Sequence, residues 1–163
     1  MNRNDTLKLA NAGMIAALYV VLTVLAAQFN LANGAIQVRF SEALTILPVF
    51  TAAAVPGLTV GCILANILTG CAMWDVVFGS LATLLGAIGT HLLRKTENPV
   101  LGCIPPIIAN VVIVPIVLMK VYGVEDGYPY LALTVGIGEV VCCGVLGVLL
   151  YRQLKKSKRF EDL

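Results

Sequence analysis

The chain has 163 residues, of which 59% are apolar and only 12% charged, and its mean hydropathy is +0.92. This composition excludes an ordinary soluble domain, and the net charge of +2 is too small to indicate a nucleic-acid-binding protein. Because each membrane crossing needs about 20 residues, we expect one all-α integral membrane domain over residues 1–163, with a basic tail at 152–163.

The first apolar span runs from Leu9 to Ala27. Basic residues precede it and small residues end it, which is also typical of a signal peptide, although the span is long for an h-region. It carries two ridges of small residues at four-residue spacing, Ala12 with Ala16 and Gly13 with Ala17. Such ridges allow close helix packing, either within the bundle or with another protein.

The next apolar stretch, residues 43–69, is either one kinked helix or two short helices. A single helix would be about 40 Å long against a hydrocarbon core of about 30 Å, and Val55-Pro56-Gly57 has strong turn chemistry. We therefore expect two short helices here. With the flanking spans, the expected helices are Leu9–Ala27, Ala43–Val55, Gly57–Thr69, Trp74–Leu93, Val100–Val121 and Tyr130–Tyr151.

The cations favour an orientation with both termini in the cytoplasm. Six crossings then place nine of the eleven Lys and Arg residues inside and only Arg39 and Lys120 outside. A five-crossing arrangement would still place eight inside, so this rule gives only a slight preference. Helix length and the Pro-Gly turn favour the six-helix bundle.

Six polar residues interrupt or flank the apolar spans. A carboxylate near the centre of a bilayer costs about 2.5–3.5 kcal/mol, so such a residue is a candidate for ligand binding. Glu139 lies about 14 Å into the last span, after two glycines that allow close approach. Judged by depth, all six face one cavity open to the outside: Arg39, Glu42, Asn66, Asp75, Asn110 and Glu139.

Each of these residues also has a purely structural interpretation. Arg39 and Glu42 have the i, i+3 spacing of an ion pair that closes a helix start. Asn66 and Asn110 fit hydrogen bonds between helices, and Asp75 fits a helix cap. The sequence leaves these alternatives open.

Carboxylates and amides together suit a heterocycle that carries N–H groups, or an amine, more than an anion. Aromatic residues near the outer surface either stack on such a ring or form a membrane-interface belt. They are Phe40, Trp74, Tyr122, Tyr128 and Tyr130.

Other chemistry has little support. The five cysteines have no C-x-x-C spacing and are interpreted as small packing residues, and the single histidine, His91, lies beside Arg94 and Lys95 at a segment end. We expect no metal, no cofactor and no catalytic residues. The sequence has no G-x-x-x-x-G-K-[ST] phosphate loop, so the chain cannot hydrolyse ATP by that route.

Distinctive motifs are spread over nearly the whole chain. They are Arg39-Phe40-Ser41-Glu42-Ala43-Leu44-Thr45 with Leu47-Pro48, Pro56-Gly57-Leu58, Ala65-Asn66, Asp75, Phe78-Gly79-Ser80-Leu81-Ala82-Thr83-Leu84, Pro105-Pro106 with Asn110, and Gly138-Glu139. In this combination they resemble the QueT family. That family comprises substrate-binding (S) components of energy-coupling factor (ECF) transporters assigned to queuosine precursors.

The resemblance implies a six-transmembrane-helix bundle of the ECF S-component type in the cell membrane, with both termini cytoplasmic. It implies capture of a 7-deazaguanine, either queuine or its aminomethyl or cyano precursor, and partnership with a transmembrane coupling subunit and two ATPase subunits. The ridge at Ala12 and Ala16 resembles the docking surface for the coupling subunit. On this basis Glu139 and Glu42 bind the ligand and Arg39 orients Glu42. Asn66, Asp75 and Asn110 support them.

Three alternatives stay open at this point. The chain is an S component for another vitamin or nucleobase, a small membrane enzyme that uses the carboxylates as acid and base, or a structural membrane subunit. The enzyme alternative lacks a nucleophile or a metal cluster, and its carboxylates are dispersed along the sequence.

Overall fold

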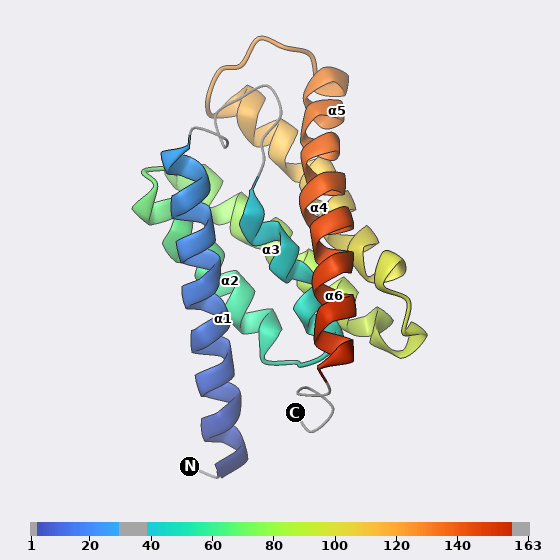
Figure 1. The fold of residues 1–163 in the computed structure, drawn as a ribbon. Helices are drawn as coiled ribbons and strands as arrows, with labels where there is room; N and C mark the ends of the chain where they lie inside the picture. Colours follow the sequence, from blue (N-terminus) through green and yellow to red (C-terminus); the bar gives the residue numbers. More distant parts are fainter. Residues whose placement is uncertain (1–2, 30–38, 158–163) are drawn as a thin grey trace.

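The chain forms a bundle of helices in the computed structural model, which describes residues 3–29 and 39–157. These residues contain no strand and make six helical rods in succession (Figure 1). The start of the first rod and the end of the last lie at the same end of the bundle, the lower end in Figure 1. The rods are α1 (Arg3–Gln28), the 3₁₀ helix η1 (Phe40–Val49), α2 (Ala54–Leu68), α3 (Met73–Leu92) extended by the 3₁₀ turn η2 (Leu93–Thr96), α4 (Pro99–Lys120), and a last rod of α5 (Tyr128–Glu139), the π-helical segment η3 (Val140–Leu146) and α6 (Gly147–Lys156).

Within the described residues, four rods are long and apolar enough to cross a membrane by length and composition. They are Arg3–Gln28, Met73–Thr96, Pro99–Lys120 and Tyr128–Lys156. The other two, η1 and α2, are apolar but have only 10 and 15 residues. The predicted all-helical fold with six helices is confirmed. Because a crossing takes about 20 residues of α-helix and two of these helices are shorter, six full crossings stay a prediction.

The boundary predicted between the second and third helices is wrong. In place of a helix at Ala43–Val55, the 3₁₀ helix η1 ends at Val49 and the chain turns before α2 begins at Ala54. Pro56 lies in the first turn of α2, where backbone N–H groups have no partner within the helix. A proline there loses no hydrogen bond, so the Pro-Gly pair starts a helix instead of separating two helices.

Helices α1 and α2 pack closely because small residues face each other. A Cβ atom added at Gly57 would lie 2.7 Å from the carbonyl oxygen of Ala12, and one at Gly61 would lie 3.0 Å from the Cα atom of Ala16. Of the two small-residue ridges on α1, the one at Ala12 and Ala16 is therefore used inside the bundle. The face with Gly13 is exposed, and a Cβ atom there would meet nothing within 4 Å.

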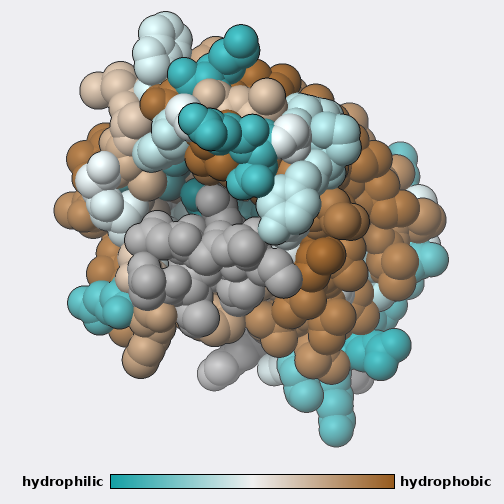
Figure 2. All heavy atoms as spheres, turned by 90° about the horizontal axis from the view of Figure 1, so that it is seen from above, coloured by the Kyte–Doolittle hydropathy of each residue, from teal (hydrophilic) through white to brown (hydrophobic). Residues whose placement is uncertain are grey.

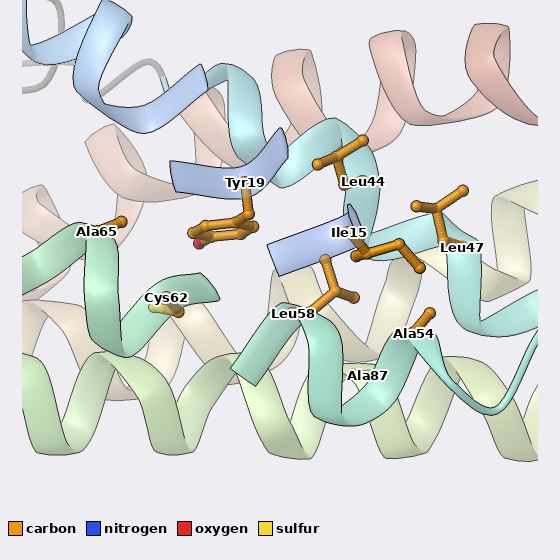
Figure 3. Close-up of a cluster of buried hydrophobic side chains, with 9 residues drawn as sticks. All are labelled: Ile15, Tyr19, Leu44, Leu47, Ala54, Leu58, Cys62, Ala65 and Ala87. Atoms are coloured by element: carbon orange, nitrogen blue, oxygen red, sulfur yellow. The ribbon is translucent and has the colours of Figure 1, made fainter. Parts of the chain in front are cut away.

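The main apolar core joins α1, η1 and α2, with one residue from α3 (Figure 3). Its buried members are Ile15, Tyr19, Leu44, Leu47, Ala54, Leu58, Cys62, Ala65 and Ala87. Tyr19 is 1% exposed and brings a phenolic hydroxyl into this core. The core fixes η1 between its neighbours, and so sets the position of the polar residues at the start of η1.

Candidate ligand-binding site

A polar cavity of about 430 Å³ opens at the end of the bundle opposite the two chain termini. Figure 2 views this end, where hydrophilic residues border one side of a hollow while hydrophobic residues cover the flank. The volume is within the range of about 300–1,000 Å³ that is usual for small-molecule sites. The residues lining it are Thr23, Ala27, Arg39, Asn66, Thr69, Cys71, Asp75, Val114, Leu118, Tyr122, Val124, Asp126, Tyr130, Leu131, Thr134 and Val135.

Asp75 and Arg39 bring opposite charges to this cavity. Asp75 is the third residue of α3, and its Oδ2 atom accepts a hydrogen bond of 3.0 Å from the hydroxyl of Tyr122. The same hydroxyl accepts from the backbone N–H of Ala72 at 3.1 Å. The N-cap residue of α3 is Ala72, and Asp75 lies in the first turn of the helix, so Asp75 does not occupy the cap position.

Tyr122 lies in the connection between α4 and α5 and ties it to the start of α3. Burial, together with the charge of Asp75, raises the pKa of Tyr122 to about 12. The phenol therefore stays protonated at neutral pH and remains a hydrogen-bond donor to Asp75.

Asn66 reaches the cavity from the last turn of α2 and is almost fully buried. Its Nδ2 atom lies 3.6 Å from the sulfur of Cys62 in the same helix. Because Gly79 has no side chain, the Asn66 amide can lie against α3, 3.2 Å from where a Cβ atom would be. Among the described residues, the contacts of the Asn66 side chain include no hydrogen bond to another helix.

Glu42 is buried in η1, with 2% of its surface exposed. Its Oε1 atom accepts a hydrogen bond of 2.6 Å from the hydroxyl of Tyr19, whereas its Oε2 atom has no hydrogen-bond partner within the described ranges 3–29 and 39–157. Among the described residues no ion pair joins Glu42 to Arg39, so the helix-closing salt bridge is wrong. The backbone N–H of Glu42 donates to the carbonyl of Arg39 instead, at 3.0 Å.

Glu139 ends α5 and is 8% exposed, so it faces the bundle interior and not lipid. Its Oε1 atom accepts a hydrogen bond of 2.9 Å from Nδ2 of Asn110 on α4, and its Oε2 atom has no hydrogen-bond partner in the described part of the chain. The π-helical segment begins at the next residue, Val140, and π-helical turns are frequent at functional sites.

The buried polar residues form a layer directly beneath the cavity. Tyr19, Asn110 and Glu139 each lie one helical turn from a cavity-lining residue of the same helix: Thr23, Val114 and Val135. The structure thus places Arg39, Asn66 and Asp75 on the cavity wall, and Glu42, Asn110 and Glu139 in the layer below it.

Sequence reasoning missed the contribution of α1 to this site. Tyr19 orients Glu42, and the hydroxyl of Thr23 donates to Ser41 at 2.8 Å. The available signal was the four-residue spacing of Tyr19 and Thr23 on the buried face of an otherwise apolar helix.

The aromatic candidates divide between the cavity and the outer surface. Tyr122 and Tyr130 line the cavity. Trp74 is 61% exposed on the outside of the bundle and stacks on Phe78, with ring centroids 6.0 Å apart. Tyr128 does not line the cavity either.

The cysteines are free, and four of the five are buried. Cys103 and Cys143 pack together, and Cys103 Sγ donates to the carbonyl of Cys143 at 3.1 Å. Among the described residues no group of three His, Cys, Asp or Glu side chains could hold a metal ion.

Comparisons with known proteins identify relatives over most of the chain. The family model described as QueT transporter matches residues 9–156. The chain is also 34% identical over 86 residues to the queuosine precursor transporter QueT of Lactococcus lactis subsp. cremoris strain MG1363. That alignment covers 52% of this chain and 50% of the relative, so the chain matches about half the length of that protein. No solved structure matches the chain.

Proposed function

Because the chain belongs to the QueT family, whose model describes a membrane transporter and not an enzyme, we propose that it is the substrate-binding subunit of an ECF-type ABC importer. Its ligand in this proposal is a 7-deazaguanine queuosine precursor, either queuine or its aminomethyl or cyano precursor. The named relative, a queuosine precursor transporter, supports this substrate class.

The observation that carries the proposal is a pair of buried carboxylate oxygens without partners. Oε2 of Glu42 and Oε2 of Glu139 are both buried, and neither accepts a hydrogen bond from the residues that the structure describes. A buried acceptor left unpaired costs about 1–3 kcal/mol, and more when it is charged. A ligand that donates N–H groups to both oxygens recovers this cost on binding.

A 7-deazaguanine has the matching chemistry. Its ring N–H and its exocyclic amine are adjacent donors on one edge, which suits a carboxylate. The Asn110 amide already donates to Glu139 and so holds that carboxylate in place, while Tyr19 does the same for Glu42. Asn66, Asp75 and Arg39 on the wall, with Tyr122 and Tyr130, then enclose the rest of the ring.

The proposed topology has six crossings with both termini in the cytoplasm, so that the cavity opens outward. The start of α1 and the end of α6 lie at the same end of the bundle (Figure 1), which supports an even number of crossings. The 3₁₀ geometry of η1 also supports a crossing role, because a rise of about 2.0 Å per residue extends its ten residues further than an α-helix would.

Uphill import then requires partners, because the chain has no phosphate loop. We place a transmembrane coupling subunit and two ATPase subunits in this role. Docking of the coupling subunit at Ala12 and Ala16 stays a prediction. In the isolated bundle Ala16 is buried against α2. A partner helix approaching α1 would first meet the exposed neighbouring face with Gly13 and Ala17.

Thermal unfolding of the purified protein with a panel of 7-deazaguanines, other nucleobases and vitamins tests the proposal. A ligand present at 100 times its Kd stabilises the folded protein by about 2.7 kcal/mol. We expect a rise in Tm with queuine or a precursor and none with guanine-unrelated vitamins. A rise with a vitamin alone would support the alternative S component, and no rise with any ligand would contradict the proposal.

A further inference from the structure

A second concavity lies on the outer face of the bundle, between α3 and α4, and shares no residue with the polar cavity. Its volume is about 650 Å³. We call it the α3–α4 groove and define it by Trp74, Phe78, Leu81, Ile113, Ile116, Val117, Lys120 and Val121. Seven of these eight side chains are apolar, and both helices are candidate membrane spans. An apolar groove at this position is therefore in contact with lipid chains.

The stacked rings of Trp74 and Phe78 form one wall of the groove. Their ring planes are 21° apart, so together they give a flat surface along α3. Leu81, 40% exposed, and Ile116, 48% exposed, extend the apolar surface deeper into the span. Such a surface suits an extended acyl chain, which gains free energy by leaving no void against it.

Lys120 gives the groove its single charge. It is the last residue of α4, is exposed, and has no ion pair among the described residues. In the proposed orientation it is one of only two cations on the outer side, against the usual bias of positive charge to the cytoplasmic side. An unpaired ammonium at the membrane-surface end of an apolar groove is complementary to a phosphate headgroup.

We propose that the α3–α4 groove binds an anionic phospholipid of the outer leaflet, with an acyl chain against Trp74 and Phe78 and the headgroup phosphate on Lys120. The site lies directly behind the ligand cavity. Trp74 faces the groove while Asp75 lines the cavity, and Val121 and Tyr122 divide in the same way. The bound lipid thus braces the two segments that the Tyr122–Asp75 hydrogen bond holds together.

The sequence supplies a reporter, because Trp74 is its only tryptophan. The full chain is reconstituted in phosphatidylcholine vesicles that contain increasing fractions of brominated phosphatidylglycerol or brominated phosphatidylcholine, and quenching of tryptophan fluorescence is measured. Bromine quenches only at close range, so quenching reports the lipid in the groove. We expect half-quenching at about a fivefold lower fraction of the anionic lipid than of the zwitterionic one, since one cation near the surface contributes about that factor.

Lys120→Gln should make the two quenching curves coincide. Lys156→Gln, which removes the same charge from an exposed position at the other end of the bundle, should leave the preference intact. Coincident curves for the wild type would overturn the proposal by showing generic lipid contact only. Absence of quenching by either lipid would overturn it by showing that something other than lipid covers the groove, and an anionic preference that survives Lys120→Gln would place the headgroup elsewhere.

Discussion

Replacing Tyr19 by Phe tests whether α1 holds the buried carboxylate of Glu42 in place. Tyr19 is 1% exposed, so its ring is packed on all sides. The substitution removes only the hydroxyl and introduces no new atom, so the packing of the ring is kept. The lost hydrogen bond is short, 2.6 Å, and its acceptor is the one partnered oxygen of Glu42. The variant therefore has a buried carboxylate with no hydrogen bond at either oxygen.

A hydrogen bond to a charged group contributes about 1.5–3 kcal/mol to stability. For a chain of this size a loss of about 2 kcal/mol lowers Tm by about 4–8 °C. Without its orienting partner Glu42 also presents its free oxygen less well, so we expect binding of the 7-deazaguanine to weaken about tenfold, or about 1.4 kcal/mol.

The matched control is Tyr151→Phe in α6, at the end of the bundle away from the cavity. Tyr151 is also buried, but its hydroxyl donates to the backbone carbonyl of Glu97 at 3.1 Å and is remote from the cavity. Thermal unfolding without ligand and calorimetric titration with ligand are measured for both variants. The reasoning is refuted if Tyr19→Phe keeps the wild-type Tm, or if both variants lose ligand affinity equally.

Three further outcomes follow from the packing and polar contacts. Gly61→Ala should lower the unfolding free energy by about 1–3 kcal/mol, because the added Cβ atom would lie 2.8 Å from the Cβ atom of Tyr19 on α1. Gly13→Ala, at a position open to solvent or lipid, should not destabilise the protein. Equal Tm values for the two variants would contradict the close packing of α1 and α2. Asn110→Ala removes the hydrogen-bond donor to Glu139. We expect it to lower the unfolding free energy by about 1–3 kcal/mol, and with it Tm, and to weaken ligand binding. An unchanged Tm would show that the amide does not stabilise the buried carboxylate. In an absorbance titration, the difference between wild type and Tyr122→Phe should show a tyrosinate midpoint at about pH 12, and a midpoint near the ordinary value of about 10 would disprove the burial and charge effect.

Much of the fold was accessible from the sequence because hydropathy and bilayer thickness constrain helix number and length together. The last four predicted spans each overlap one rod of the structure. The boundary at η1 was missed because proline and glycine indicate a turn and a helix start equally well. Only the tertiary packing of Gly57 and Gly61 on α1 decides between them.

The sequence predicts how deep each candidate residue lies in the bundle, but not the rotation of its helix about the helix axis. Chain position along a helix gives the height of Asn110 or Glu139, yet the direction of a side chain around the axis depends on which helices pack against it. The 3₁₀ and π-helical segments change that direction near Glu42 and Glu139, and no period in the sequence indicates them. For the same reason Trp74 and Asp75 lie on different faces of α3 although they are adjacent in sequence: Trp74 lines the α3–α4 groove and Asp75 lines the cavity.

The central claim is that the Oε2 atom of Glu139, in the layer beneath the cavity, accepts a hydrogen bond from the ligand. The most direct measurement is the Kd of the aminomethyl precursor for wild type, Glu139→Gln and the control Glu125→Gln, an exposed carboxylate in the α4–α5 connection that does not line the cavity. The account predicts more than tenfold weaker binding for Glu139→Gln, about 1.4 kcal/mol or more, and wild-type binding for Glu125→Gln. Equal affinities in all three proteins would contradict it.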